Sequence, residues 1–284
     1  MKILGDYHLH TRYSDGLAKV FDMVRAARER GLSEVAITEH GFGAWGPGLR
    51  RRNLERLRGD IESARAEMPV LFGIEANIVS EDGRIDLKDD ERGQFDIVLL
   101  GLHLRVCYAW KTFFTFFIPN MFWNVIHWVP VGRIRKNTET VKKAVMRNQI
   151  DILAHPGRYF KVDVVEVAKI CAERNTLMEI NTKKISFRPV DFERMRAAGA
   201  KFIIGSDAHS VKRVGDCARA EEFLKNCTYD ESEIINLKQT YTQYKNKNKK
   251  EKTADATKNK EPALETTGTQ EEVIKRKRGW FKSK

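Results

Sequence analysis

The sequence predicts an α/β fold, a closed or nearly closed TIM-like β/α barrel of seven strands, from three observations. Short apolar runs alternate with segments of helical periodicity. The runs are mostly apolar without a regular polar alternation, which is typical of parallel strands that are covered on both faces. Histidines and carboxylates follow the runs at their carboxyl ends, where the active sites of parallel α/β folds lie. Seven strands in 284 residues favour a barrel, and an open sheet is the alternative.

The seven expected strands are apolar runs of five to eight residues, and most of them are rich in Ile, Val and Leu. Side chains of this kind fit the buried, pleated surface of a central strand. The runs are residues 3–8, 34–38, 70–75, 95–102, 150–154, 176–180 and 201–206.

Amphipathic segments between several of these runs are the expected helices. Gly31 marks the end of the first helix and Gly199 the end of the last. An Asn-Thr pair of the type that caps helices begins the third, at Asn137. The five expected helices are residues 19–30, 53–67, 137–147, 162–174 and 189–198.

Composition indicates a folded chain whose basic character is concentrated at one end. Apolar residues make up 42% of the sequence, which is enough for a sizeable core. The formal charge is +12, but residues 241–284 alone contain 13 Lys/Arg against 6 Asp/Glu. The globular part therefore needs no polyanionic partner.

Cysteine usage and the amino terminus indicate a cytoplasmic protein. The four cysteines form no C-x-x-C pair, so we expect reduced and mostly buried thiols. The first residues are too polar for the core of a signal peptide. The cysteines are Cys107, Cys171, Cys217 and Cys227.

An aromatic insertion, residues 105–135, interrupts the alternation with nine aromatic side chains. Residues 113–131 are long enough to suggest a membrane span, but polar residues and prolines interrupt them. We expect a lid that shelters the site, with peripheral membrane docking or a subunit contact as alternatives. The interrupting residues are Pro119, Asn120, Asn124, His127 and Pro130.

The residues after about Tyr241 are rich in Lys, Asn, Thr and Glu, and we expect a disordered basic tail. Its last stretch, "VIKRKRGWFKSK", combines a basic cluster with Trp280 and Phe281. This composition suits an acidic membrane surface or nucleic acid, and a solvated tail is the alternative.

Nine potential metal ligands lie at or near the carboxyl ends of the expected strands. Imidazole is the commonest nitrogen ligand for zinc and similar ions, and carboxylates complete such sites. Alternate residues of a strand share a face. His8 and His10 have this spacing and can hold one ion, and Asp207 and His209 repeat it. Nine ligands are enough for more than one ion. They are His8, His10, Asp15, His40, Glu75, His103, His155, Asp207 and His209.

Glu75 is a single carboxylate near the expected rim, and its two oxygens can bridge two ions. Histidine-rich sites with a few carboxylates suit zinc, manganese or iron better than calcium. Glu39 precedes His40, and we expect it to form a salt bridge, with support of a ligand histidine as the alternative. His127 lies outside every motif and is left without a role.

These motifs resemble those of the PHP (polymerase and histidinol phosphatase) superfamily. The resemblance covers residues 1 to about 227 and depends on "HLH", "SDG", "TEH", "GIEAN", "GLH", "AHPGR" and "GSDAH" in this order. It implies a distorted seven-stranded β/α barrel with two or three divalent ions at its carboxyl rim. It also implies hydrolysis of a phosphate ester by a hydroxide that bridges the ions. We therefore expect a phosphoesterase domain in residues 1–228, followed by a short helical end and tail in residues 229–284.

The resemblance further divides the nine ligands among three ions, with Glu75 as the bridge between the first two. Glu75 and Asp207 are thereby expected to act in catalysis. The first set is His8, His10, Glu75 and Asp207, the second is Glu75, His103 and His155, and the third is Asp15, His40 and His209.

Four further polar residues are candidates for contact with the substrate. Arg158 is the expected catalytic group that binds the phosphate through its planar guanidinium, and a surface salt bridge is the alternative. Asn181 ends the sixth run, where it contacts the substrate or acts as a turn residue. Lys183 and Lys184 add positive potential or are ordinary exposed lysines.

Three hypotheses of function follow from the sequence. The first is a metal-dependent phosphatase of a small phosphomonoester, with histidinol phosphate as one candidate by resemblance only. The second is a nuclease that trims DNA ends and binds nucleic acid through the basic tail. The third is a non-enzymatic module that docks on membranes through residues 105–135 or the tail. The oligomeric state is left open.

Overall fold

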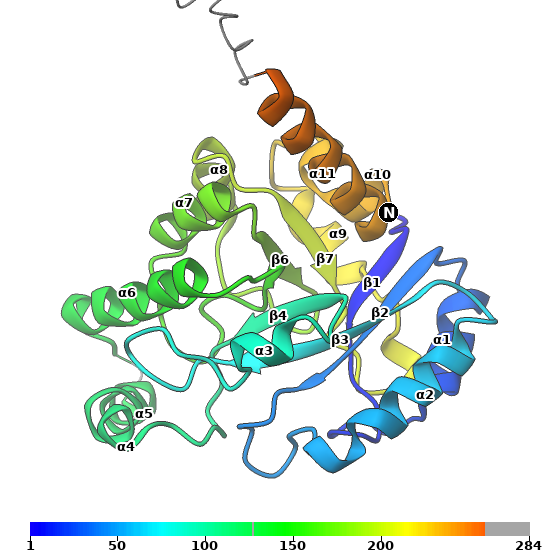
Figure 1. Cartoon of the computed structure of the whole chain (residues 1–284). Coiled ribbons are helices and arrows are strands. Elements are labelled where there is room, and N and C mark those ends of the chain that lie inside the picture. The colour runs from blue at the N-terminus through cyan, green and yellow to red at the C-terminus, as the bar shows by residue number, and fades with distance from the viewer. Residues whose placement is uncertain (127, 259–284) are drawn as a thin grey trace, which may run out of the picture. The chain divides into compact units, whose positions relative to one another are not determined.

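Seven parallel strands form one sheet in chain order in the computed structural model, which describes residues 1–126 and 128–258. Helices surround the sheet, so the fold is a distorted, nearly closed β/α barrel (Figure 1). All seven expected strands are confirmed. They are β1 (Gly5–Leu9), β2 (Glu34–His40), β3 (Val70–Asn77), β4 (Ile97–Gly101), β5 (Ile152–Leu153), β6 (Leu177–Asn181) and β7 (Phe202–Gly205).

The barrel closes between β1 and β7 through few backbone contacts. Near the carboxyl rim, the His10 N–H donates to the Ala208 carbonyl (2.9 Å) and the Ala208 N–H to the His8 carbonyl (3.1 Å). Further down, the side chain of Asn236 takes the place of strand pairing. Its Oδ1 accepts from the Ile204 N–H (3.0 Å), and its Nδ2 donates to the carbonyls of Gly5 and Ile204 (both 2.8 Å).

The helices bury apolar stripes against the outside of the sheet. In α1, Val20, Met23, Val24 and Ala27 are buried, which is the spacing of one helical face. Gly31 has a φ of +71° and ends this helix, as expected. The other helices of the barrel are α2 (Leu54–Ala64), α3 (Asp89–Arg92), α6 (Val131–Arg147), α7 (Val164–Arg174), α8 (Pro189–Ala197), α9 (Ala218–Leu224) and α10 (Ile235–Lys238), with α1 spanning Val20–Glu29.

The expected start of the third helix is wrong. Helix α6 begins at Val131, six residues before Asn137, and Pro130 precedes its first turn in an extended conformation. Asn137 lies inside the helix and is fully buried. Its side chain bonds the Asn120 side chain and the Lys161 carbonyl, so a tertiary contact explains this residue better than a helix cap.

The aromatic insertion forms a helical segment at the periphery of the barrel, beside α6 (Figure 1). This helical segment consists of α4 (Trp110–Thr112), the π-helix η2 (Phe113–Phe117) and α5 (Ile118–Val125), and the last residues of the insertion belong to α6. None of the described helices is both long enough and apolar enough to cross a membrane.

The expectation of disorder from Tyr241 is wrong as far as Lys258, because α11 spans Tyr241–Lys258. Tyr241 and Tyr244 are buried, and they belong to the same compact unit as the barrel, Met1–Tyr244. The rest of the tail, with Trp280 and Phe281, lies outside the described residues. The division of the chain at residue 228 stays a prediction.

All four cysteines are free thiols, but the expectation that most are buried is wrong. Cys171 alone among them is buried, in the core face of α7. Cys107 is exposed, and the remaining two are half-buried.

We expect Asn236→Ala to lower the free energy of unfolding by about 1–3 kcal/mol or more, because it leaves buried backbone groups of β1 and β7 without partners. Urea denaturation followed by circular dichroism measures the change. The control is Asn226→Ala, where the side chain is exposed and makes one long bond to the Glu222 carbonyl. Equal midpoints for the two variants would contradict the role of Asn236 in closure.

Candidate metal centre

The carboxyl ends of the strands bring the nine expected ligands together. His8 lies in β1 with His10 just beyond it, His40 ends β2, and Glu75 lies near the end of β3. The other ligands lie in loops that follow β1, β4, β5 and β7. Because parallel strands end at one rim, residues that are distant in sequence meet there.

The carboxylate of Glu75 lies at the centre of this cluster and is fully buried. Its Oε1 is 2.7 Å from His155 Nε2 and 3.2 Å from His103 Nε2. Its Oε2 is 2.8 Å from His40 Nδ1 and 3.7 Å from His10 Nε2. Imidazoles from four different strand ends thus surround one carboxylate.

The nine residues form four overlapping groups, and within each group the ligand atoms lie within 4.8 Å of one another. Glu75 belongs to two of the groups, as a bridging carboxylate requires. His10 also belongs to two groups. In one of them it joins Asp15, His40 and His209, the residues expected to hold the third ion. The groups are His10, Asp15, His40 and His209; His8, His10 and Asp207; His8, Glu75 and His155; and His40, Glu75 and His103.

Buried atoms of this cluster fit bound cations. His8 Nε2 and both ring nitrogens of His10 are buried without a hydrogen-bond partner, and Glu75 Oε2 forms no hydrogen bond although His40 Nδ1 approaches it to 2.8 Å. A buried polar atom without a partner costs about 1–3 kcal/mol, so such atoms are rare in native proteins. Nitrogen and carboxylate donors of this kind match zinc, manganese or iron.

Protonation also suits metal binding at two of these residues. Burial and the neighbouring His40 hold the pKa of His10 well below its usual range, which leaves a neutral ring. Burial opposes ionisation of Glu75, but His103 and His8 outweigh it and hold the pKa of this carboxyl well below its usual range. A neutral imidazole and an ionised carboxylate are the forms that bind metal.

The sequence analysis missed Glu179 and Asn77, which orient the ligands. Glu179 Oε1 is 2.7 Å from His8 Nδ1, an arrangement that directs Nε2 of His8 into the cluster. Asn77 Oδ1 is 2.6 Å from His103 Nδ1 in the same way. A charged residue inside the apolar run "TLMEIN" was the available signal, because such residues are seldom buried without a partner.

Glu39 fills neither of its expected roles. Among the described residues it forms no ion pair, and its carboxylate accepts from the Thr11 N–H and from the hydroxyls of Thr11 and Ser14. These bonds hold the loop that carries Asp15, whose Oδ1 is 3.4 Å from His40 Nε2 and 3.3 Å from His209 Nε2.

Two of the ligands lie in strained backbone. His155 has a φ of +30° and Asp207 a φ of +49°, a region that L-residues seldom adopt. The Glu179 side chain accepts from the His155 N–H (2.7 Å) and so helps to hold this conformation. Strain of this kind costs of order 1–3 kcal/mol per residue and is common at functional sites.

Positive side chains lie beside Asp207 at the mouth of the cluster. Arg158 Nη1 is 2.6 Å from Asp207 Oδ2. Both side chains are mostly buried, so this contact differs from the surface salt bridge considered above. Lys183 Nζ is 3.3 Å from Asp207 Oδ1 and equally close to His209 Nδ1. Lys184 is exposed, as an ordinary surface lysine is.

Asn181 combines a structural role with a place in the site. Its Oδ1 accepts from the backbone N–H groups of Lys183 and Lys184, as a turn residue does. Its Nδ2 donates to Glu179 (2.9 Å) and lies 3.4 Å from Asp207 Oδ2. The side chain is buried, and it contacts both the ligand Asp207 and Glu179, which orients His8.

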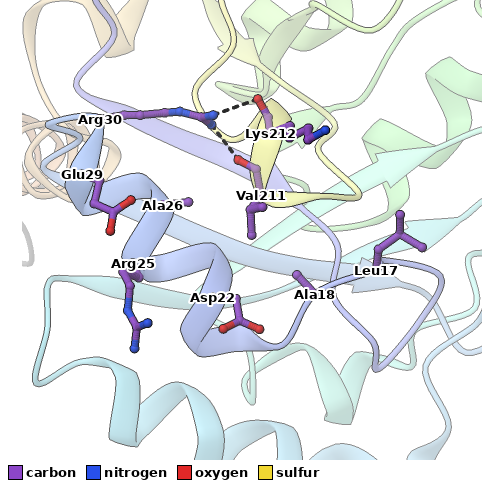
Figure 2. Close-up of a pocket in the computed structure, with 9 residues that line it drawn as sticks. All are labelled: Leu17, Ala18, Asp22, Arg25, Ala26, Glu29, Arg30, Val211 and Lys212. Carbon is purple, nitrogen blue, oxygen red and sulfur yellow. Dashed lines mark hydrogen bonds between the residues drawn. The ribbon is translucent and has the colours of Figure 1, made fainter.

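A hollow of about 490 Å³ lies beside α1, and none of the nine ligands lines it (Figure 2). Arg30 reaches across it and donates to the carbonyls of Val211 and Lys212. The backbone N–H of Leu17, at its edge, donates to the His209 carbonyl (2.7 Å). These bonds secure the two loops that carry Asp15 and His209.

Comparison with known proteins agrees with this geometry. A model of the PHP domain matches residues 6–183. A probable phosphatase of Thermoanaerobacter sp. (strain X514) is 28% identical over 250 residues, which cover 83% of this chain and 91% of the relative. The DNA polymerase/3'-5' exonuclease PolX of Bacillus subtilis (strain 168) is 26% identical over 228 residues, 76% of this chain but 36% of the relative.

Solved structures share the fold. Histidinol phosphate phosphatase from Lactococcus lactis, complexed with zinc, L-histidinol and phosphate, aligns with a TM-score of 0.55 at 17% identity. The alignment covers 81% of this chain and 95% of that chain. A protein from Listeria monocytogenes described as a putative histidinol phosphatase aligns with a TM-score of 0.52 at 16% identity, over 75% of this chain and 97% of that chain.

We expect Glu179→Gln to weaken metal binding about 10- to 100-fold, because His8 loses the carboxylate that orients it. Titration of the metal-free protein with zinc or manganese, followed by calorimetry, measures the affinity. Glu166→Gln, which removes the exposed ion pair with Lys169, is the control. Unchanged affinity in Glu179→Gln would show that this residue does not support the ligands.

Proposed function

Because the chain belongs to the PHP domain family and is a metal-dependent phosphoesterase, we propose that it hydrolyses a small phosphomonoester. The observation that carries the proposal is the convergence of nine potential ligands, Glu75 among them, with Arg158 and Lys183 beside Asp207. Family membership also favours an enzyme over the non-enzymatic module considered from the sequence. A cytoplasmic location is part of the proposal.

The cluster is proposed to bind two or three divalent ions, held by the nine ligands in the groups described above. Bound there, the ions acidify water and offset the negative charge of a phosphate. The chain's own residues keep the ligand atoms fixed, since Glu179, Asn77 and Glu39 bond the ligands or their loops.

Arg158 and Lys183 are proposed to bind the phosphate of the substrate. Both contact Asp207, which holds their charged groups at the edge of the cluster. The planar guanidinium of Arg158 can donate two parallel bonds to phosphate oxygens, and Lys183 adds a point charge. Glu75 and Asp207 are the proposed catalytic ligands, and Asn181 keeps Asp207 in position.

Histidinol phosphate is one candidate substrate, because the Lactococcus lactis enzyme with a similar fold is a histidinol phosphate phosphatase. Other phosphorylated small molecules are equally compatible with the cluster. DNA end trimming is the second candidate function, supported by the similarity to PolX and by the basic composition of the tail.

The test of the enzyme compares two variants in a screen over sugar phosphates, nucleotides, histidinol phosphate and short DNA. We expect Glu75→Ala to lose bound metal and turnover together, because the carboxylate is shared by two ligand groups. Arg158→Lys should keep its metal but raise KM about 10- to 100-fold, since it loses a charged two-point contact with phosphate. Metal analysis and steady-state kinetics separate the two effects. A Glu75→Ala protein with full activity would refute the metal-centred reaction.

Removal of residues 259–284 distinguishes the phosphatase from the nuclease. Truncation after Lys258 leaves the buried Tyr241 and Tyr244 in place, so the barrel should remain folded. We expect hydrolysis of small phosphomonoesters to change less than about twofold, because the ligands all lie within the barrel. A loss of DNA cleavage with a steep dependence on salt would favour the nuclease instead.

A further inference from the structure

The helical segment α4–η2–α5 buries two polar side chains together with Phe116, and it leaves several large apolar side chains exposed. Thr112, Phe116 and Asn120, spaced by four residues, are buried. Asn120 exchanges two hydrogen bonds with the side chain of Asn137 (2.9 and 2.8 Å). The hydrogen bonds of Asn120 and the burial of Phe116 thus fix one side of the segment to the barrel.

The outward side of the segment is an exposed apolar face of the molecule. Trp110 is 80% exposed, Phe122 57% and Val125 71%, and the spacing of three or four residues places them in one stripe. Contiguous exposed apolar surface of this kind marks a binding surface. The apolar face consists of Trp110, Phe114, Ile118, Phe122, Val125 and Ile126, and Trp128 and Val131 extend it along the chain.

The charged side chains that the segment and its flanks contribute around the apolar face are all basic, and Glu81 of a neighbouring loop pairs with one of them, Lys136. Residues 97–138 contain no Asp or Glu but five Lys/Arg. Three of these basic residues, Arg105, Lys111 and Arg135, are exposed and form no ion pair with any residue that the structure describes. A cationic fringe beside exposed Trp and Phe matches the headgroup region of an anionic bilayer.

We propose that this apolar face docks on an anionic phospholipid surface without crossing the bilayer. Charge favours lipid over a second copy of the chain, because a twofold interface would place the cationic fringe against itself. Asn124 of the segment, and Tyr108 just before it, bond backbone carbonyls at or near the metal centre. The Tyr108 hydroxyl donates to the His103 carbonyl (2.5 Å), and Asn124 Nδ2 donates to the Tyr159 carbonyl (2.8 Å).

Sedimentation of the full chain with lipid vesicles tests the proposal. Wild-type protein should pellet with vesicles of equal parts phosphatidylcholine and phosphatidylglycerol, and less with phosphatidylcholine alone. The double change Trp110→Ser and Phe122→Ser should weaken binding about tenfold or more, since both side chains are exposed and make no core contact. Phe21→Ser in α1, a partly exposed aromatic elsewhere, should bind as wild type does.

A charge variant and the tail complete the test. Lys111→Glu should weaken binding to the anionic vesicles, and Arg25→Glu in α1 should weaken it less. Truncation after Lys258 should leave vesicle binding in place. The proposal is overturned if wild type does not pellet, or if only the truncation abolishes binding. It is also overturned if sedimentation velocity shows a dimer that the double change at Trp110 and Phe122 dissociates.

Discussion

The burial of one carboxylate among imidazoles is the constraint on which the rest of this molecule depends. Glu75 is inaccessible to solvent, and it approaches rings from four strand ends. A buried carboxylate destabilises the folded state unless neighbouring groups neutralise its charge, and the surrounding imidazoles have this role. Glu179, Asn77 and the strained backbone at His155 all serve this centre. The fold supplies seven strand ends at one rim, and the site uses most of them.

Much of the fold and the ligand set could be predicted from the sequence because both leave local patterns. The strands are buried on both faces, so their runs are mostly apolar, and the ligands lie near the ends of such runs or follow them. Residues whose role depends on tertiary partners were read wrongly or missed. Asn137 resembles a helix cap in sequence, but it bonds Asn120 across two helices. Glu179 looks like one polar residue in a strand, although its partners His8 and His155 are distant in sequence.

The aromatic insertion shows how polarity can serve opposite purposes in one chain. Two of the polar residues that argue against a membrane span, Asn120 and Asn124, bond the barrel. These bonds leave Trp110, Phe114 and Phe122 exposed on the opposite side of the segment. A sequence window averages the two faces and registers only an apolar stretch with interruptions. The structure separates the faces, and no described helix is suited to crossing a bilayer.

The seam between the first and last strands has a consequence for assembly of the molecule. Its backbone bridge joins Leu9 to Ala208, and these residues lie in the middle of the pairs His8/His10 and Asp207/His209. An ion held by His8, His10 and Asp207 would link both ends of the barrel where few backbone bonds join them. Loading of the centre and completion of the fold are therefore linked equilibria, and chelation should loosen the whole barrel as well as inactivate it.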